Sequence, residues 1–265
     1  MNILRNISFG QYIPGKSLVH DFDPRIKILG CLLIIISLFL ISHFWGYLVL
    51  GILLLLGIIL SNIHPRFVFR GLRAILYIII FTLILHLFMT QGETIFRWGF
   101  LKITREGLIN GLFVSCRLFL LILTTSLLTL TTSPISLTDG IEKLLTYFKF
   151  MGLPAHEIAM MMTIALRFIP TLLEETEKIM KAQISRGADF DSGSIINRTK
   201  NLIPILVPLF VNAFRRADEL AIAMEAKGYR GGEGRTHYRE LQMNKKDILF
   251  FTLIVILTIM VSLLF

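Results

Sequence analysis

The chain has 265 residues, of which 54% are hydrophobic and only 17% are charged, and its mean hydropathy is +0.72. This composition excludes an ordinary soluble domain, in which roughly a quarter of the residues carry a charge. The formal net charge of +9 does not indicate nucleic-acid binding here, because the cations gather between apolar runs, as they do in the cytoplasmic loops of membrane proteins.

Five apolar runs predict membrane-spanning helices. They are Ile26–Ile41, Tyr47–Leu60, Ala74–Met89, Leu108–Thr131 and Ile248–Phe265. Such runs approach the length that crosses a hydrocarbon core, and in lipid every backbone amide needs a partner inside its own segment. We therefore expect an all-α polytopic membrane protein with about five transmembrane helices. Four of these spans lie in residues 1–131 and the last lies in residues 248–265.

The distribution of Lys and Arg predicts the orientation, since cytoplasmic loops carry an excess of these residues. The cations are Arg5, Lys16, Arg25 and Lys27 at or before the first run, and Arg66, Arg70 and Arg73 after the second. The tip between the two runs, residues 42–46, is uncharged. We expect a multi-pass protein of the cell membrane with a cytoplasmic amino terminus and an external carboxyl terminus. The amino-terminal segment lacks the apolar stretch of a signal peptide.

Residues 132–247 carry many charges and follow an even number of spans, so we expect them on the cytoplasmic side, in water or against the membrane. Proline and glycine positions predict helices over residues 133–150, 155–168, 170–185 and 199–227. The last of these is apolar in its first half, where it contains Pro204 and Pro208, and amphipathic in its second half. It is therefore expected to kink at the prolines and to end in water.

Two predicted helices of this region end with the same three kinds of residue: a small residue, a long cation and a glycine. They are Ser185-Arg186-Gly187 and Ala226-Lys227-Gly228. Ordinary capping explains either ending alone, because glycine adopts the left-handed conformation after a helix and a cation complements the helix dipole. The recurrence favours a second interpretation, in which two similar cationic tips bind two similar sites on partner proteins.

The same segments resemble a known family. Arg167-Phe168-Ile169-Pro170, then Leu172-Leu173-Glu174 and Ala182-Gln183-Ile184-Ser185-Arg186-Gly187, are similar to the signature of the transmembrane T component of energy-coupling factor (ECF) transporters. Phe22-Asp23-Pro24-Arg25-Ile26-Lys27 resembles the Asp-Pro-Arg motif that leads into the first span of that family. Ala226-Lys227-Gly228 matches its second coupling motif, with Lys227 in place of the usual arginine. The resemblance covers nearly the whole chain in order.

This resemblance implies a non-catalytic scaffold of an ATP-driven micronutrient importer. It would couple two ATP-binding cassette ATPase subunits to a substrate-binding S component in the membrane. The residues that would bind the ATPase subunits are Ser185, Arg186, Gly187, Ala226, Lys227 and Gly228. Lys227 keeps the charge of arginine but lacks its bidentate fork, so its contact with a carboxylate is expected to be weaker. No cofactor, metal or nucleic acid is expected, and the S component would recognise the solute.

A stand-alone secondary transporter or a membrane enzyme is the alternative. Such transporters show internal repeats, broken spans or intramembrane carboxylates, and the five apolar runs contain no Asp or Glu. His86 could relay protons or simply pack, and Arg117 could be functional or could extend toward the membrane surface. Cys31 and Cys116 lack the spacing of a disulfide framework or metal site, and the glycines of residues 228–236 lack P-loop spacing.

Overall fold

The computed structural model describes residues 12–98, 101–148, 150, 152–188, 190, 194–231 and 243–264. This part of the chain forms two compact units. Residues 12–141 and 243–264 form the first, which we call the bundle, and residues 142–231 form the second, which contains two long helices. Helix α6 (Pro134–Thr146) runs from the first unit into the second.

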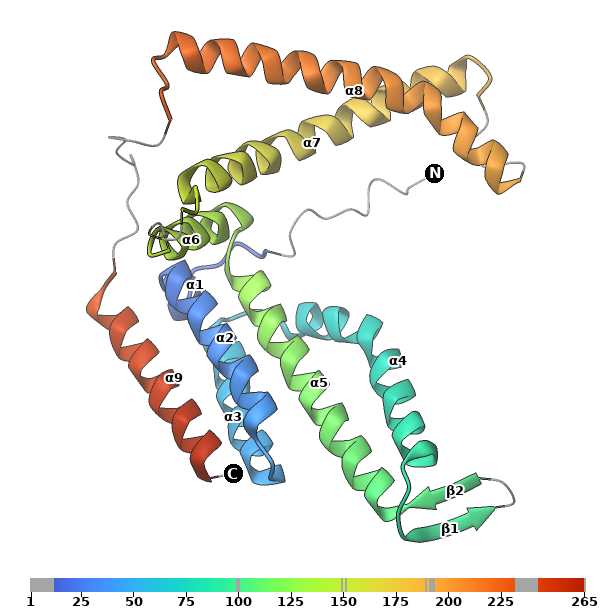
Figure 1. Ribbon diagram of the computed structural model, residues 1–265, viewed down its shortest axis with the longest axis vertical. Coiled ribbons are helices and arrows are strands. Elements are labelled where there is room, and N and C mark those ends of the chain that lie inside the picture. The colour runs from blue at the N-terminus through green and yellow to red at the C-terminus, as the bar shows by residue number, and fades with distance from the viewer. Residues whose placement is uncertain are drawn as a thin grey trace. The chain divides into compact units, whose positions relative to one another are not determined.

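Helices account for almost all of the bundle (Figure 1). In chain order its elements are α1 (Leu18–Asp21), α2 (Pro24–Leu40), α3 (Phe44–Leu60), α4 (Pro65–Met89), β1 (Thr94–Trp98), β2 (Leu101–Thr104), α5 (Arg105–Thr131), the start of α6, and α9 (Lys245–Leu264). α5 packs against α2, α3 and α4, while α9 packs against α2 and α3. β1 and β2 form an antiparallel hairpin in the connection between α4 and α5.

Local sequence signals set where the bundle helices begin. Asp23 caps α2, because its carboxylate accepts the Arg25 backbone N–H at 2.8 Å, and Pro24 has the fixed φ that suits a first helical turn. Thr104 caps α5 in the same way, with its hydroxyl accepting the Gly107 N–H at 3.1 Å. Each cap satisfies a backbone amide that would otherwise lack a partner.

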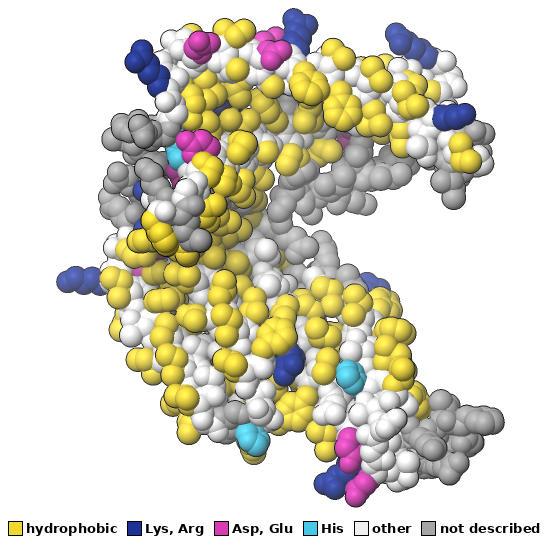
Figure 2. Space-filling model, in the orientation of Figure 1, with side chains coloured by type: hydrophobic (Ala, Val, Ile, Leu, Met, Phe, Trp, Pro, Cys, Tyr) yellow, Lys and Arg dark blue, Asp and Glu magenta, His cyan; other side chains and the backbone are white. Residues whose placement is uncertain are grey.

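The interior of the bundle consists of aliphatic side chains from its long helices. Buried examples are Leu38, Leu50, Leu54, Leu72, Leu130 and Val261. The outward faces are apolar as well: Figure 2 shows hydrophobic side chains over most of the visible bundle surface, with few charged ones between them. An apolar surface of this extent on a folded unit is what a lipid environment requires, because lipid and not water covers it.

The second unit is dominated by α7 (Ala155–Ser185) and α8 (Ile195–Ala226). The prediction of two helices separated before Pro170 is wrong, since α7 continues through this proline. A proline inside a helix removes one hydrogen bond and bends the axis, but the turns on either side can hold the helix together. α8 contains Pro204 and Pro208 and changes direction in its first half, as predicted (Figure 1). The helix predicted over residues 133–150 ends at Thr146.

Among the described residues, α5, α7 and α9 are long and apolar enough to cross a membrane, and α4 is a fourth candidate if its two bent segments form one span. α2 and α3 have 17 residues each, which is about 26 Å of helix and close to the shortest length that spans a bilayer. The predicted all-α polytopic membrane fold is confirmed. The division into residues 1–131, 132–247 and 248–265 stays a prediction.

Two segments that connect the predicted spans contain secondary structure. α4 begins at Pro65, so residues 65–73 are helical, and this segment is bent by 51° from Ile75–Met89. Val68 and Leu72 of this segment are buried in the core of the bundle. The sequence did not indicate this buried side, because the three arginines give the segment a polar composition. The second segment, between the third and fourth apolar runs, contains the hairpin of β1 and β2.

Candidate functional site

The carboxyl end of α7 is closed by a Schellman motif. Gly187 has φ +87°, its N–H donates to the Ile184 carbonyl at 2.9 Å, and the Ala188 N–H donates to the Gln183 carbonyl at 3.0 Å. These bonds satisfy two carbonyls that a helix end leaves unpaired. An L side chain resists positive φ, so this position favours glycine. Arg186 is consequently held at the C-cap, where the helix stops.

α8 ends with the same backbone geometry. Gly228 has φ +77°, its N–H donates to the Glu225 carbonyl at 2.8 Å, and the Tyr229 N–H donates to the Met224 carbonyl at 3.0 Å. Lys227 is the C-cap residue. A Cβ added at either terminal glycine would meet nothing within 4 Å. Each glycine is therefore explained by its backbone conformation and not by a close neighbour inside the chain.

The six predicted partner-binding residues are all exposed. They are Ser185, Arg186 and Gly187 at the end of α7 and Ala226, Lys227 and Gly228 at the end of α8. Across the described part of the chain, no carboxylate lies within ion-pair distance of Arg186 or Lys227. The two side chains are therefore available for contacts with another molecule.

α7 and α8 cross in an antiparallel arrangement (Figure 1). Glu175 of α7 lies at the crossing, where its Oε1 accepts from Asn212 Nδ2 at 2.7 Å and its Oε2 lies 3.4 Å from the Arg216 guanidinium. The Glu175 side chain is only 18% exposed, so water screens these contacts less than it screens a surface ion pair. Sequence reasoning did not identify Glu175, because its partners lie on another helix.

Gln183 makes a second contact between the two helices. Its Nε2 donates to the Pro204 carbonyl of α8 at 3.5 Å, which is a long hydrogen bond. Pro208 is four residues after Pro204 and has no N–H, so the Pro204 carbonyl lacks the donor that an α-helix normally supplies. The Gln183 amide takes the place of that donor. This contact lies three residues before Arg186 and connects the end of α7 to the bent half of α8.

The antiparallel crossing places the two tips at opposite ends of the helix pair. Arg186 follows Glu175 by 11 residues, and Lys227 follows Asn212 by 15 residues in the opposite direction. With a rise of 1.5 Å per residue the two tips lie up to about 40 Å apart. The structure therefore does not bring the six residues together into one site. It gives two separate tips of the same local shape.

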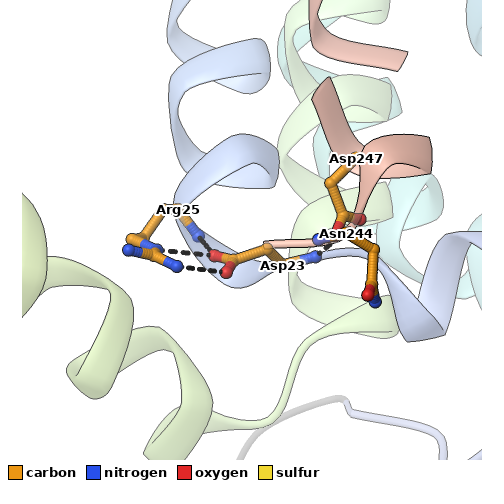
Figure 3. Close-up of polar contacts among 4 residues, drawn as sticks. All are labelled: Asp23, Arg25, Asn244 and Asp247. Atoms are coloured by element: carbon orange, nitrogen blue, oxygen red, sulfur yellow. Dashed lines mark hydrogen bonds and ion pairs between the residues drawn. The ribbon is translucent and has the colours of Figure 1, made fainter. Parts of the chain in front are cut away.

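The Asp-Pro-Arg motif belongs to the bundle and connects two helix starts (Figure 3). The Asp23 carboxylate accepts from Arg25 Nε at 3.0 Å and from Nη2 at 2.7 Å. The Asp23 backbone N–H donates to Asp247 Oδ1 at 3.3 Å, and the Asn244 N–H donates to Asp247 Oδ2 at 2.8 Å. Asp247 is only 2% exposed. Its carboxylate both caps α9 and holds the start of α2.

The charges around this contact are more buried than the sequence indicated. Burial raises the pKa of Asp23, but the hydrogen bonds and charge of Arg25, together with the charge of Lys27, outweigh it, so the pKa lies below its ordinary value of 3.8. Lys27, one of the amino-terminal cations that set the predicted orientation, is only 8% exposed. Its Nζ donates to the His20 carbonyl at 2.9 Å and to the Thr131 carbonyl at 3.2 Å, which ties α2 to the end of α5.

Arg117, in the interior of α5, has neutral partners. Its Nε donates to the Tyr47 hydroxyl at 3.1 Å, and its guanidinium lies 5.3 Å from the centroid of the Phe39 ring. A hydrogen bond and a cation–π contact stabilise the charge, and no carboxylate of the described residues forms an ion pair with it. His86 lies at the contact of α4 with α5, where its Cβ is 3.2 Å from the place that a Cβ on Gly111 would occupy. This position favours a packing role for His86.

Comparison with known proteins agrees with the motifs. Residues 15–238 match the family described as cobalt transport protein (CbiQ). The chain is 56% identical over 247 residues to the energy-coupling factor transporter transmembrane protein of Ruminiclostridium cellulolyticum, covering 93% of this chain and 92% of that protein. It is 49% identical over 264 residues to the protein of the same description in Bacillus subtilis, covering 99% and 98%. The chain therefore belongs to the family of energy-coupling factor transporter transmembrane proteins.

Proposed function

We propose that this chain couples two separate ATP-binding cassette ATPase subunits to a substrate-binding S component in the membrane, with one ATPase subunit docked on each of its two cationic tips. As a member of its family, the chain is a non-catalytic transmembrane subunit of a transporter. In this proposal the α7 tip (185–187) and the α8 tip (226–228) enter a groove on one ATPase subunit each and meet acidic side chains there.

The observation that carries the proposal is the equivalence of the two tips. Both expose a cation at the C-cap, both close with the same pair of backbone hydrogen bonds, and neither cation has a carboxylate partner among the described residues. Two equivalent tips at opposite ends of one helix pair suit a dimer of similar ATPase subunits, which presents two equivalent grooves.

In this proposal the apolar surface of α8 contacts the S component and the membrane. Phe210, Val211 and Phe214 are 59%, 61% and 69% exposed. An amphipathic helix that exposes this much apolar area needs lipid or a partner helix to cover it. We place α7 and α8 at the cytoplasmic side of the cell membrane, with the amino terminus of the chain on the same side.

Energetics distinguish docking from ordinary capping. A cation that is desolvated against a carboxylate at an interface loses on the order of 2–5 kcal/mol when it is truncated. A cation that only complements its own helix dipole contributes about 0.3–1 kcal/mol. Docking therefore predicts that the tip variants lose complex assembly while the isolated chain stays folded.

The test is assembly with the ATPase subunits and solute uptake by the resulting complex. Arg186→Ala should weaken both, and Arg186→Glu should be worse, because it places like charges together. Lys227→Ala should do less, since lysine offers a point contact and not a fork. Gly187→Val and Gly228→Val should also impair coupling, because a β-branched residue resists positive φ and would redirect the tip.

Lys178→Glu provides the matched control. Lys178 is an exposed cation on α7 two turns before the tip, so the variant makes the same charge reversal on the same helix. It should assemble and transport like the parent protein. If Arg186→Glu also assembles and transports normally, the tips are only helix caps and the docking proposal is wrong. If Lys178→Glu is as impaired as Arg186→Glu, general charge and not the tip determines assembly.

A further inference from the structure

The first segment of α4 exposes arginine and phenylalanine side chains that neither the core nor the two tips explain. Residues 65–73 form a short helical arm that follows the end of α3 and is bent by 51° from Ile75–Met89. The arm lies directly before one of the apolar segments of the bundle. Ile75–Met89 contains no Lys, Arg, Asp or Glu, whereas the arm contains three arginines, and this change of composition at the end of an apolar helix suits the headgroup layer of a membrane.

One side of the arm packs into the bundle, and the opposite side is exposed. Val68 and Leu72 are 6% and 4% exposed and belong to the core of the bundle. Positions 66, 70 and 73, all arginine, are spaced by four and three residues, so they share the side of the helix opposite Val68 and Leu72. The Arg66 and Arg73 side chains are exposed.

Aromatic side chains lie on both flanks of this arginine face. Phe67 and Phe69 are 40% and 68% exposed, and at 100° per residue they fall on either side of the line through positions 66, 70 and 73. In the part of the chain that the structure describes, neither Arg66 nor Arg73 forms an ion pair with a carboxylate. The arm thus combines uncompensated positive charge with exposed aromatic rings at the end of an apolar helix.

We propose that the arginine face of residues 65–73 binds the headgroups of anionic phospholipids. The guanidinium groups of Arg66 and Arg73 contact lipid phosphates, for which their planar donors are suited. Phe67 and Phe69 insert among the upper acyl carbons, as aromatic residues do at membrane interfaces. The bend after Arg73 allows this, because it turns the arm away from the direction of Ile75–Met89.

An acidic protein surface is the other class of partner that could meet these arginines. The exposed phenylalanines and the direct continuation into an apolar helix favour lipid, because an apolar segment that borders the arm brings hydrocarbon next to the two rings. The proposal concerns the bundle alone. It does not depend on ATPase docking, nor on which side of the membrane this end of the bundle faces.

The experiment measures bound lipid on the full-length chain in nanodiscs made of phosphatidylcholine or of its mixture with phosphatidylglycerol. Native mass spectrometry counts the phosphatidylglycerol molecules that stay bound, and a lipid titration gives their affinity. Arg66→Gln combined with Arg73→Gln should weaken phosphatidylglycerol binding about 30-fold, which is the factor for ~1 kcal/mol per cation. Arg66→Lys combined with Arg73→Lys should keep most of the binding, and added salt should weaken it in the parent protein.

Lys245→Gln combined with Lys246→Gln is the matched control. Both lysines are exposed at the start of α9, close to the start of α2, and removing them takes away the same charge from the same end of the bundle. This control should keep the phosphatidylglycerol affinity of the parent protein within a few fold. The proposal is overturned if the arginine variant binds phosphatidylglycerol like the parent, or if the lysine variant loses as much. It is also overturned if the arginine variant loses its ATPase subunits but not its lipid, which would make the arm a protein-docking surface.

Discussion

Asp23 and Asp247 each use one carboxylate for two purposes. Asp23 caps α2 and pairs with Arg25, whereas Asp247 caps α9 and accepts the backbone N–H of Asp23. Both side chains are buried, so breaking either contact leaves a charge or an amide without a partner, which costs more than a surface ion pair contributes. The Asp-Pro-Arg motif therefore has a definite structural function: it joins the start of the first long helix, α2, to the start of the last helix, α9.

The pH dependence of stability should report the Asp23 carboxylate. Its pKa in the folded protein lies below 3.8, so its contribution is fully present above that pH and is lost as the pH falls through the lower, folded value. Thermal unfolding of the parent in detergent, followed by circular dichroism, should therefore change little from this group between neutral pH and about pH 5. Below pH 3.8 the stability should fall.

Asp23→Asn separates this group from the other carboxyls. Asparagine still caps a helix but cannot form the ion pair with Arg25, so the variant should be less stable than the parent at neutral pH by about 1–3 kcal/mol. The difference between the two proteins should narrow below pH 3.8. A constant difference across the whole pH range would show that the ionised form of Asp23 is not what stabilises the fold.

At the scale of helices, prolines shape the α7–α8 pair without ending either helix. Pro208 leaves the Pro204 carbonyl without its helical donor, and Gln183 supplies a donor from α7. This side chain lies in the segment that resembles the family signature. Its hydrogen bond connects the last turns of α7 to the bent part of α8.

A double-mutant cycle tests this contact. Gln183→Ala should destabilise the parent protein by about 0.5–1.5 kcal/mol, because it removes one hydrogen bond to a carbonyl. In a Pro208→Ala background the cost should fall toward zero, since the new N–H at position 208 bonds the same carbonyl. In a Pro204→Ala background Gln183→Ala should keep its full cost. The new N–H at position 204 donates to the carbonyl of residue 200, so the carbonyl of residue 204 still lacks a helical donor. Equal costs of Gln183→Ala in the parent and in Pro208→Ala would contradict the contact.

For the whole molecule, the membrane topology depends on α7. This helix is long and apolar enough to span a bilayer, yet its position after four predicted spans and its cationic end suit the cytoplasmic surface. If α7 lies at the surface, the connection between α7 and α8 is cytoplasmic. If α7 crosses the membrane, the same connection is outside the cell.

Cysteine labelling distinguishes these topologies. Single cysteines are introduced by Ser194→Cys and by an added residue after Phe265, in a background in which Cys31 and Cys116 are replaced by serine. An impermeant thiol reagent on intact cells should label the cysteine after Phe265 and leave position 194 unlabelled until the membrane is opened. Labelling of position 194 but not of the cysteine after Phe265 would reverse the predicted orientation, whereas labelling of both positions in intact cells would show that α7 spans the bilayer. Labelling of neither position would contradict the external carboxyl terminus.

Local patterns predicted much of the fold. The apolar runs gave the long helices of the bundle, because in lipid an apolar run has to form an internally hydrogen-bonded helix. The glycines at positions 187 and 228 predicted the helix ends, because the left-handed conformation of a Schellman motif favours glycine. Pro170 misled the prediction, since a proline signals a helix boundary in the sequence even where packing and neighbouring turns carry the helix through it.

The sequence by itself determined the family, the membrane environment and the two cationic tips, since each of these depends on residues that are close together in the chain. Only the tertiary structure decided that Lys27 and Asp247 are buried, that Glu175 meets Asn212, and that Gln183 serves the Pro204 carbonyl. It also decided that the tips point to opposite ends of the α7–α8 pair. The physical reason is the same in each case: the partner of a buried polar group is fixed by which helices lie side by side, and residue spacing along one helix carries no information about that.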